Sequence, residues 1–328
     1  MAEIESDADK AMRDGLSQFR EKMETSNRRF LQDRVTEIEA VHLPTEADKL
    51  VQMRDYWDKL GEGGPDPYWN SIAGPGPVRE DREVRNVKHL ADVPSLYHQY
   101  MDGVCSPRLR TEAWRQMYRA TFHEVCSAAV ADDSQGQEAE EIPLCEELLL
   151  FLKYANGVSD PDFRRSGIAS FMPGFYIGVP EYAEEEEVEG LRDLEAQREA
   201  LRGYLEDSLL GQVELHGTVD DDLEVKVGFL TGSGGWRDED LWYSAYAYCR
   251  VIGGEETDSR YNDWAWRVVF FEATEENPTT LYGRRPLFNS IPEFLEWYSS
   301  WPDYVDMRQV RRNVQGYYTQ CEVDCGCG

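Results

Sequence analysis

The sequence predicts an α+β fold, in which helices flank an antiparallel sheet and a helical extension precedes them. Two observations lead to this prediction. Apolar residues in the first half of the chain recur at helical spacing, whereas residues from Val213 onward form short runs rich in aromatic and β-branched side chains. Helices grouped before strands favour α+β over alternating βαβ units. With 41% hydrophobic residues, the 328-residue chain can bury a sizeable core.

A long polar helix is predicted over about residues 4–40. Its apolar side chains fall near one stripe and are Leu16, Phe19, Met23, Phe30 and Leu31. No strict heptad persists, so a coiled coil is the weaker alternative. A second helix is predicted to begin after Thr45 and to end at Gly61, with an apolar face of Leu50, Met53, Trp57 and Leu60. Residues 61–77 repeat Gly and Pro and are predicted to form a loop.

Three shorter helices are predicted next. The first lies near residues 94–101, and the second has Pro107 at its first helical position. Residues 131–141 are small and polar, as in a linker. The third helix is opened by Ile142-Pro143, and Asn156-Gly157 predicts a left-handed stop at its end.

The second half of the chain is predicted to form the sheet. An acidic surface helix at residues 181–210 precedes it, and strands are predicted at 225–230, 241–252 and 264–272. A last helix is predicted at 292–298. Side chains of a strand alternate between faces, so one face of the middle strand would carry Trp242, Ser244, Tyr246 and Tyr248.

Four segments then suggest a family. They are IPLCEELLLFLKYANG at residues 142–157, GSGGW at 232–236, WAWRVVFFE at 264–272 and FNSIPEFLEWY at 288–298. In this order they resemble the opening helix, glycine turn, strand and closing helix of the SMI1/KNR4 (SUKH) superfamily. The resemblance covers about residues 142–300, roughly half of the chain.

This resemblance implies a SUKH-like α+β domain that has no catalytic site and binds another protein. It implies that bacterial relatives are immunity proteins that neutralise toxins, and that fungal relatives are scaffolds in cell-wall and stress signalling. We accordingly expect a helical, loop-rich extension at residues 1–107 and a SUKH-like domain at 108–305 with an acidic insertion at about 181–210. A tail at 306–328 carries Cys321, Cys325 and Cys327.

The charge balance restricts the partner. Asp and Glu total 64 against 34 Lys and Arg, which gives a net charge of −30. Such a surface repels nucleic acid and anionic lipid and favours a protein partner with a basic surface, although plain solubility explains it equally well. No run approaches the ~20 apolar residues of a membrane span. With no secretory signal and seven scattered cysteines, we expect a cytoplasmic or nuclear protein.

Residue types that carry catalysis do not form a recognisable motif. The five histidines include no HExxH pair, and the glycines at 232–235 lack the spacing of a phosphate loop. The acidic runs at 220–222 and 238–240 do not fit a calcium loop. The cysteines of the tail lack a local fourth ligand for zinc. The sequence therefore predicts a non-enzymatic protein with no cofactor and no metal.

Contact residues are expected at strand ends and loops, where aromatic and acidic side chains lie together. They are Trp236, Asp238, Asp240, Trp242, Tyr261 and Asp263. Tyr and Trp are favoured as interface anchors, and acidic side chains at the rim speed encounter with a basic partner. The strand aromatics, which include Trp264 and Trp266, either belong to the core alone or also face a partner.

Two other classes of protein stay open. An enzyme with a dispersed active site would show His216 or a cysteine beside a carboxylate in a deep pocket. A structural subunit of a larger assembly would use residues 1–40 as a tether that becomes ordered in the complex.

Overall fold

The computed structural model describes residues 6–53, 88–95, 101–107, 111–133, 142–160, 169–174, 194–210, 223–234, 242–252, 259–272 and 287–300. Most helices come first, a five-stranded antiparallel sheet follows, and a helix closes the order. The predicted α+β fold is therefore confirmed. Within these ranges, no helix combines the length and apolar character needed to cross a membrane.

The large sheet is a meander in which each strand pairs antiparallel with the next. Its strands are β3 (Leu209–Leu210), β4 (Leu223–Gly234), β5 (Trp242–Val251), β6 (Ala265–Glu272) and β7 (Leu287–Phe288). These bounds confirm the three predicted strands. The pairing of β4 with β5 shifts register at Lys226 and again at Thr231. Two bulges therefore bend β4, the longest strand.

A small ribbon extends this sheet. It consists of β1 (Val104–Cys105) and β2 (Gly157–Val158), and residues 169–172 lie between it and β4. Phe171 pairs with β2, while the Met172 amide donates a hydrogen bond of 2.7 Å to a carbonyl of β4. The ribbon and the large sheet are thus linked by backbone hydrogen bonds.

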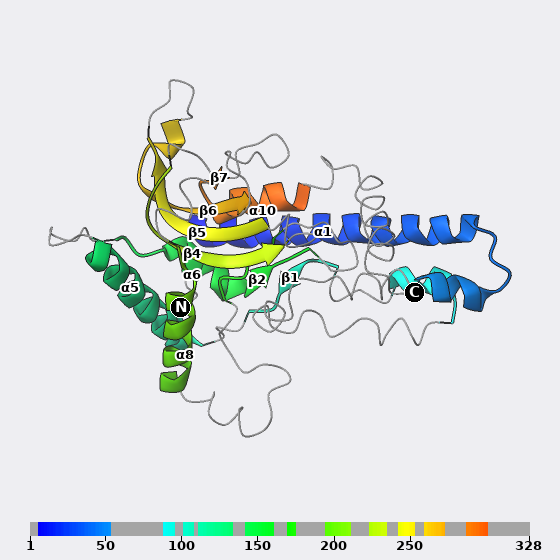
Figure 1. The fold of residues 1–328 in the computed structure, drawn as a ribbon, viewed down its shortest axis with the longest axis horizontal. Coiled ribbons are helices and arrows are strands. Elements are labelled where there is room, and N and C mark those ends of the chain that lie inside the picture. The colour runs from blue at the N-terminus through cyan, green and yellow to red at the C-terminus, as the bar shows by residue number, and fades with distance from the viewer. Residues whose placement is uncertain are drawn as a thin grey trace, which may run out of the picture.

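Helices pack on one face of the large sheet. They are α1 (Asp7–Ala40), α5 (Glu112–Asp133), α6 (Glu146–Tyr154), α8 (Leu194–Asp207) and α10 (Ile291–Ser300). In Figure 1, α10 lies along the first half of α1, and α5 lies beside α8. The second half of α1 runs on past the sheet and contacts the short 3₁₀ helix η1 (Leu90–Ser95).

The main core lies between these helices and the sheet. Rings from β6, β7 and α10 contact each other, with Phe270 5.5 Å from Phe294 and Phe288 4.9 Å from Trp297 between centroids. The first half of α1 belongs to the same core through Met12, Leu16, Phe19 and Met23. The first half of α1 thus shares a core with helices and strands that follow residue 107.

The opposite face of the sheet is also buried. Its side chains are mostly aliphatic and include Leu223, Val225, Ala245, Ala247, Cys249, Val251, Val269 and Leu287. Arg267 lies on this face with 1% of its surface exposed. Its guanidinium donates to the carbonyls of Cys249 and Arg260 and to the Asn289 side chain. Carbonyl dipoles and an amide thus compensate this buried charge.

Two helix ends differ from the prediction. α5 begins at Glu112, where the Thr111 hydroxyl accepts a hydrogen bond from the Trp114 amide, so placing Pro107 at the first helical position is wrong. The left-handed stop at Asn156-Gly157 is also wrong, because α6 ends in extended backbone and Gly157 lies in β2. Glycine is needed there because a Cβ would lie 2.8 Å from the Phe171 carbonyl oxygen, a backbone atom.

The acidic helix also ends earlier than predicted. α8 stops at Asp207, and Leu209–Leu210 form strand β3. Leu201 and Leu205 are buried, and α8 packs on α5, so this part of the predicted surface helix belongs to the core. The segment before α8 lies outside the described residues.

Further predictions lie partly or wholly outside the described residues. Helix is present at residues 46–53, and the rest of the predicted second helix is outside. The short helix expected near 94–101 corresponds in its described part to the end of η1. The loop at 61–77 and the tail at 306–328 with its three cysteines are outside altogether. The last helix is confirmed as α10.

Candidate interaction surface

The structure places two of the six predicted contact residues fully. Tyr261 and Asp263 are described, whereas Trp236, Asp238 and Asp240 lie outside the described residues. The sixth residue, Trp242, is the first residue of β5, where its backbone pairs with Gly234 and Glu272. Its side chain also lies outside the described part.

Tyr261 belongs to the buried face of the sheet. Only 7% of its surface is exposed, and its hydroxyl donates to the Leu287 carbonyl at 3.2 Å. The Arg267 guanidinium lies 5.6 Å from its ring centroid. In this structure Tyr261 therefore packs the fold and holds β7.

Asp263 is exposed, and it immediately precedes Trp264, which was not among the predicted contact residues. Trp264 is only partly buried and stacks on Tyr248 of β5, with 5.6 Å between ring centroids and 24° between ring planes. The expected alternation of β5 side chains had placed Tyr248 on an aromatic face. Trp264 was recognisable as an aromatic residue near a strand, but its partial exposure was not.

Two cations lie over the Trp264 ring. The Lys226 ammonium is 4.3 Å from the ring centroid, and the Arg250 guanidinium carbon is 4.8 Å from it. Arg250 also binds the Glu224 carboxylate, with 2.5 Å from Nε to Oε2. We call Glu224, Lys226, Tyr248, Arg250 and Trp264 the strand-end cluster. Cation–π contacts of this kind stabilise by about 0.5–1 kcal/mol at exposed sites.

The backbone explains why these side chains meet. Glu224 and Arg250 are directly opposed in the β4–β5 register, which brings their side chains within ion-pair reach. The bulge at Lys226 takes this residue out of the regular β4–β5 register and re-aims its side chain. Four of the five cluster residues lie in β4 and β5, and Trp264 directly precedes β6.

Trp266 and Trp264, two residues apart, have different surroundings. Trp266 is covered by Phe122 of α5, with 5.4 Å between centroids, and its indole nitrogen donates to the Pro143 carbonyl at 2.8 Å. Trp264, two residues earlier in the chain, is held by Tyr248 and the two cations. In Figure 1 the ends of β4, β5 and β6 curve away from α5 toward η3 (Ser259–Tyr261). Trp266 thus packs against α5, whereas the ring and cation contacts of Trp264 are with residues of β4 and β5.

Charge and burial act together in the cluster. Burial, followed by the positive charge of Arg250, lowers the pKa of Lys226 below its usual range. Burial raises the pKa of the Tyr248 hydroxyl. Burial and the neighbouring guanidinium thus both disfavour the charged form of Lys226.

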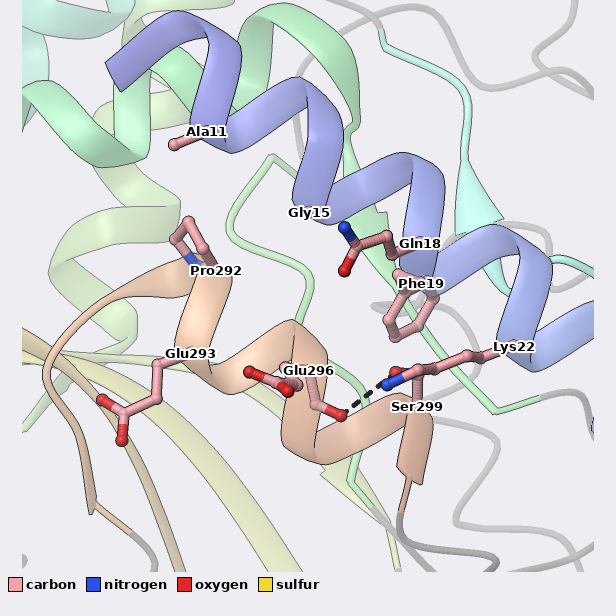
Figure 2. A pocket seen from close by; sticks show the side chains of 9 residues that line it. All are labelled: Ala11, Gly15, Gln18, Phe19, Lys22, Pro292, Glu293, Glu296 and Ser299. Carbon is pink, nitrogen blue, oxygen red and sulfur yellow. Dashed lines mark hydrogen bonds between the residues drawn. The ribbon is translucent and has the colours of Figure 1, made fainter. Parts of the chain in front are cut away.

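A hollow lies between α1 and α10 (Figure 2). This cavity of about 360 Å³ is lined by Ala11, Gly15, Gln18, Phe19, Lys22, Pro292, Glu293, Glu296 and Ser299. Gly15 and Pro292 approach closely, since a Cβ on Gly15 would lie 3.5 Å from that of Pro292. Lys22 donates to the Ser300 hydroxyl across the two helices. The hollow is a polar seam in the packing of the two helices.

Catalytic chemistry finds little support in the described residues. Among them, no group of three or more His, Cys, Asp or Glu side chains is placed to hold a metal ion. Burial raises the pKa of Cys126 to about 12 and that of Cys249 to about 11. These thiols are neutral at physiological pH and are not activated nucleophiles.

The comparisons with known proteins find no relative of this chain: no protein-family model matches it, and neither the curated proteins nor the solved structures contain a significant match. The resemblance to the SMI1/KNR4 superfamily therefore stays a prediction.

Proposed function

We propose that the chain is a non-enzymatic protein-binding module that docks its partner on the strand-end cluster. The observation that carries this proposal is Trp264, a partly exposed indole stacked on Tyr248 and bracketed by Lys226 and Arg250. Trp, Tyr and Arg are the residues most enriched at the energetic centres of protein interfaces. The cluster presents Tyr248 and Arg250 on β5 and Trp264 directly before β6.

Rigid anchors favour binding because little side-chain freedom is lost when a partner docks. Tyr248 and Trp264 are held by stacking, and Arg250 is held by Glu224. The resemblance to the SMI1/KNR4 superfamily supports the same function. It favours a signalling or cell-wall-regulation scaffold, or a toxin-neutralising immunity protein, in the cytoplasm or nucleus.

The net charge of −30 adds a long-range contribution. A field of this sign attracts partners whose overall surface is basic and speeds their encounter with the chain. It repels nucleic acid, so a protein partner is the better proposal.

Substitution of Trp264 tests the function. A Trp264→Ala bait should lose the partner that the unchanged chain captures from a lysate of its source cells, because the central anchor is removed. Captured proteins are identified and quantified by mass spectrometry after cross-linking. The expected loss is tenfold or more, about the effect of removing one interface anchor.

Trp114→Ala is the matched control. Trp114 is also a partly buried tryptophan, but it lies on α5 away from the cluster. This variant should capture the same proteins as the unchanged chain, and thermal melting should show that both variants fold. Equal capture by the Trp264→Ala and Trp114→Ala baits contradicts the proposed function.

A further inference from the structure

A mostly buried carboxyl and a fully buried hydroxyl lie within electrostatic reach of each other. Glu147 of α6 accepts a hydrogen bond of 3.0 Å from the Ile291 amide at the start of α10. The Tyr246 hydroxyl of β5 is buried and has no hydrogen-bond partner among the described residues. The charge of Glu147 acts on this hydroxyl. A buried donor without an acceptor is costly, and a carboxylate is the kind of acceptor that Tyr246 lacks.

Ring contacts connect Tyr246 to the strand-end cluster. Tyr246 stacks on Trp266, with 5.2 Å between centroids and 7° between ring planes. Trp266 in turn contacts Tyr248, which stacks on Trp264, with 5.6 Å between centroids in each pair. Close-packed interiors transmit strain because they hold few voids. A displacement of Tyr246 therefore acts on both aromatic anchors of the proposed interaction surface.

Glu147 changes charge near neutral pH, whereas its ionisable neighbours do not. Burial raises the pKa of Glu147 to about 7. The buried neighbours stay neutral, because burial raises the pKa of Tyr246, Tyr118 and Cys145 well above their usual ranges.

Charged groups where α6 meets other helices are already engaged. Glu146 pairs with Arg119 of α5, and Lys153 pairs with Asp9 of α1. On α10, the Glu293 carboxylate accepts a hydrogen bond from the Asn289 amide. These groups therefore do not compensate a charge on Glu147.

On the basis of the proposed function, we propose that the charge of Glu147 regulates partner binding at the strand-end cluster, which binds while Glu147 is neutral and loses affinity when it ionises. An ionised Glu147 is a buried charge that one backbone amide satisfies only in part. The carboxylate recruits the Tyr246 hydroxyl as a second donor. Tyr246 then moves toward Glu147 and out of its parallel stacking on Trp266, which displaces Tyr248 and Trp264.

Fluorine NMR of the full chain labelled with 5-fluorotryptophan tests this coupling without a partner. The Trp264 signal, assigned by its loss in Trp264→Phe, should titrate with a midpoint at pH about 7. Glu147→Gln and Tyr246→Phe should each remove this titration. A titration caused by His123 of α5 would persist in both variants, because histidines change charge in the same range.

Glu146→Gln is the matched control, because Glu146 is an exposed glutamate one residue earlier on α6. It should keep the titration of the Trp264 signal, and thermal melting should show that every variant folds. A Trp264 signal that does not titrate, or that titrates equally in the Glu147→Gln chain, would overturn the inference and leave the proposed function standing.

Capture from the lysate at pH 6 and pH 8 then tests regulation. Proteins whose capture depends on Trp264 should be bound at least about fivefold more strongly at pH 6, the lower end of coupling between two sites. The Glu147→Gln chain should capture them equally at both pH values. A pH dependence that persists in Glu147→Gln, or none in the unchanged chain, would overturn the inference alone. The absence of any Trp264-dependent capture would remove the proposed function and this inference with it.

Discussion

Glu147 on α6 is a mostly buried carboxyl whose ionisation affects the fold. Its carboxylate accepts a hydrogen bond of 3.0 Å from the Ile291 amide and so caps α10 from a different helix. Burial raises the pKa of Glu147 to about 7, against a smaller lowering by that hydrogen bond. The buried Tyr246 hydroxyl is close enough for the Glu147 charge to raise its pKa further. A glutamate that caps a helix at this position is half neutral at physiological pH.

Substitution of Glu147 gives a prediction with a defined sign. The folded state holds the proton more tightly than the unfolded chain, whose carboxyl has a pKa of 4.5. The free energy of unfolding should therefore fall as pH rises from about 4.5 to about 7. Glu147→Gln keeps the acceptor for Ile291 but removes the charge. At pH 8 it should be more stable than the unchanged chain by about 1–2 kcal/mol.

Urea unfolding followed by circular dichroism, repeated across this pH range, measures the effect. Glu296→Gln is the control, because Glu296 is exposed on α10. It should leave the pH dependence unchanged. A Glu147→Gln chain that loses stability at pH 8 would show that the charged carboxylate is needed as a cap and that its burial does not weaken the fold.

At the scale of elements, two glycines have different structural effects, one on helix propensity and the other on close packing. Gly203 lies inside α8, and a Cβ there would meet no atom within 4 Å. Gly232 lies in β4, where a Cβ would lie 2.2 Å from the Ser170 carbonyl oxygen. The first glycine weakens its helix, whereas the second permits the segment at residues 169–172 to join the sheet.

Alanine at these two positions should have opposite effects. Gly203→Ala should raise the free energy of unfolding by about 0.5–1 kcal/mol, because alanine favours the helix and restricts the unfolded chain. Gly232→Ala should lower it by about 1–3 kcal/mol, because the link between the ribbon and β4 must shift. Differential scanning calorimetry checks both. A stabilised Gly232→Ala chain would mean that the close approach to Ser170 is not needed.

Hydrophobic periodicity predicted the long helices and strands, but it did not predict the short segments that connect them. The helical stripe of α1 and the alternation along β5 depend on local spacing, so the sequence alone contained them. The seam at residues 169–172 depends on contacts distant in sequence, and the two-residue strands β2 and β3 are too short to show a pattern. For the same reason Asn156-Gly157 suggested a helix stop, although Gly157 serves a contact with Phe171.

The sequence predicted that an interaction surface exists at strand ends, but not which side chains form it. Aromatic residues beside acidic ones at strand ends indicated an interaction surface, and Asp263 lies next to the strand-end cluster. Burial of Tyr261 depends on Leu287 and Arg267, which lie elsewhere in the chain. The meeting of Lys226 with Trp264 depends on a bulge and a register that no local pattern specifies.

For the whole molecule, net charge influences the encounter with a partner at long range, whereas the shape of the surface influences contact at short range. The net charge of −30 is felt across a Debye length, about 8 Å at physiological ionic strength, and influences encounter. The side chains of the strand-end cluster, at the ends of β4 and β5 and just before β6, are all partly exposed. Because α1 shares the core through Leu16 and Phe19, its first half supports the sheet through α10 and α6.

Hydrogen–deuterium exchange of the free chain and of its complex with the captured partner tests the central claim most directly. We expect binding to slow exchange at residues 223–227, 248–251 and 264–266, which carry the strand-end cluster. Exchange in the second half of α1 should stay unchanged. Protection confined to α1, or to any segment other than these strand ends, would contradict the assignment of the interaction surface.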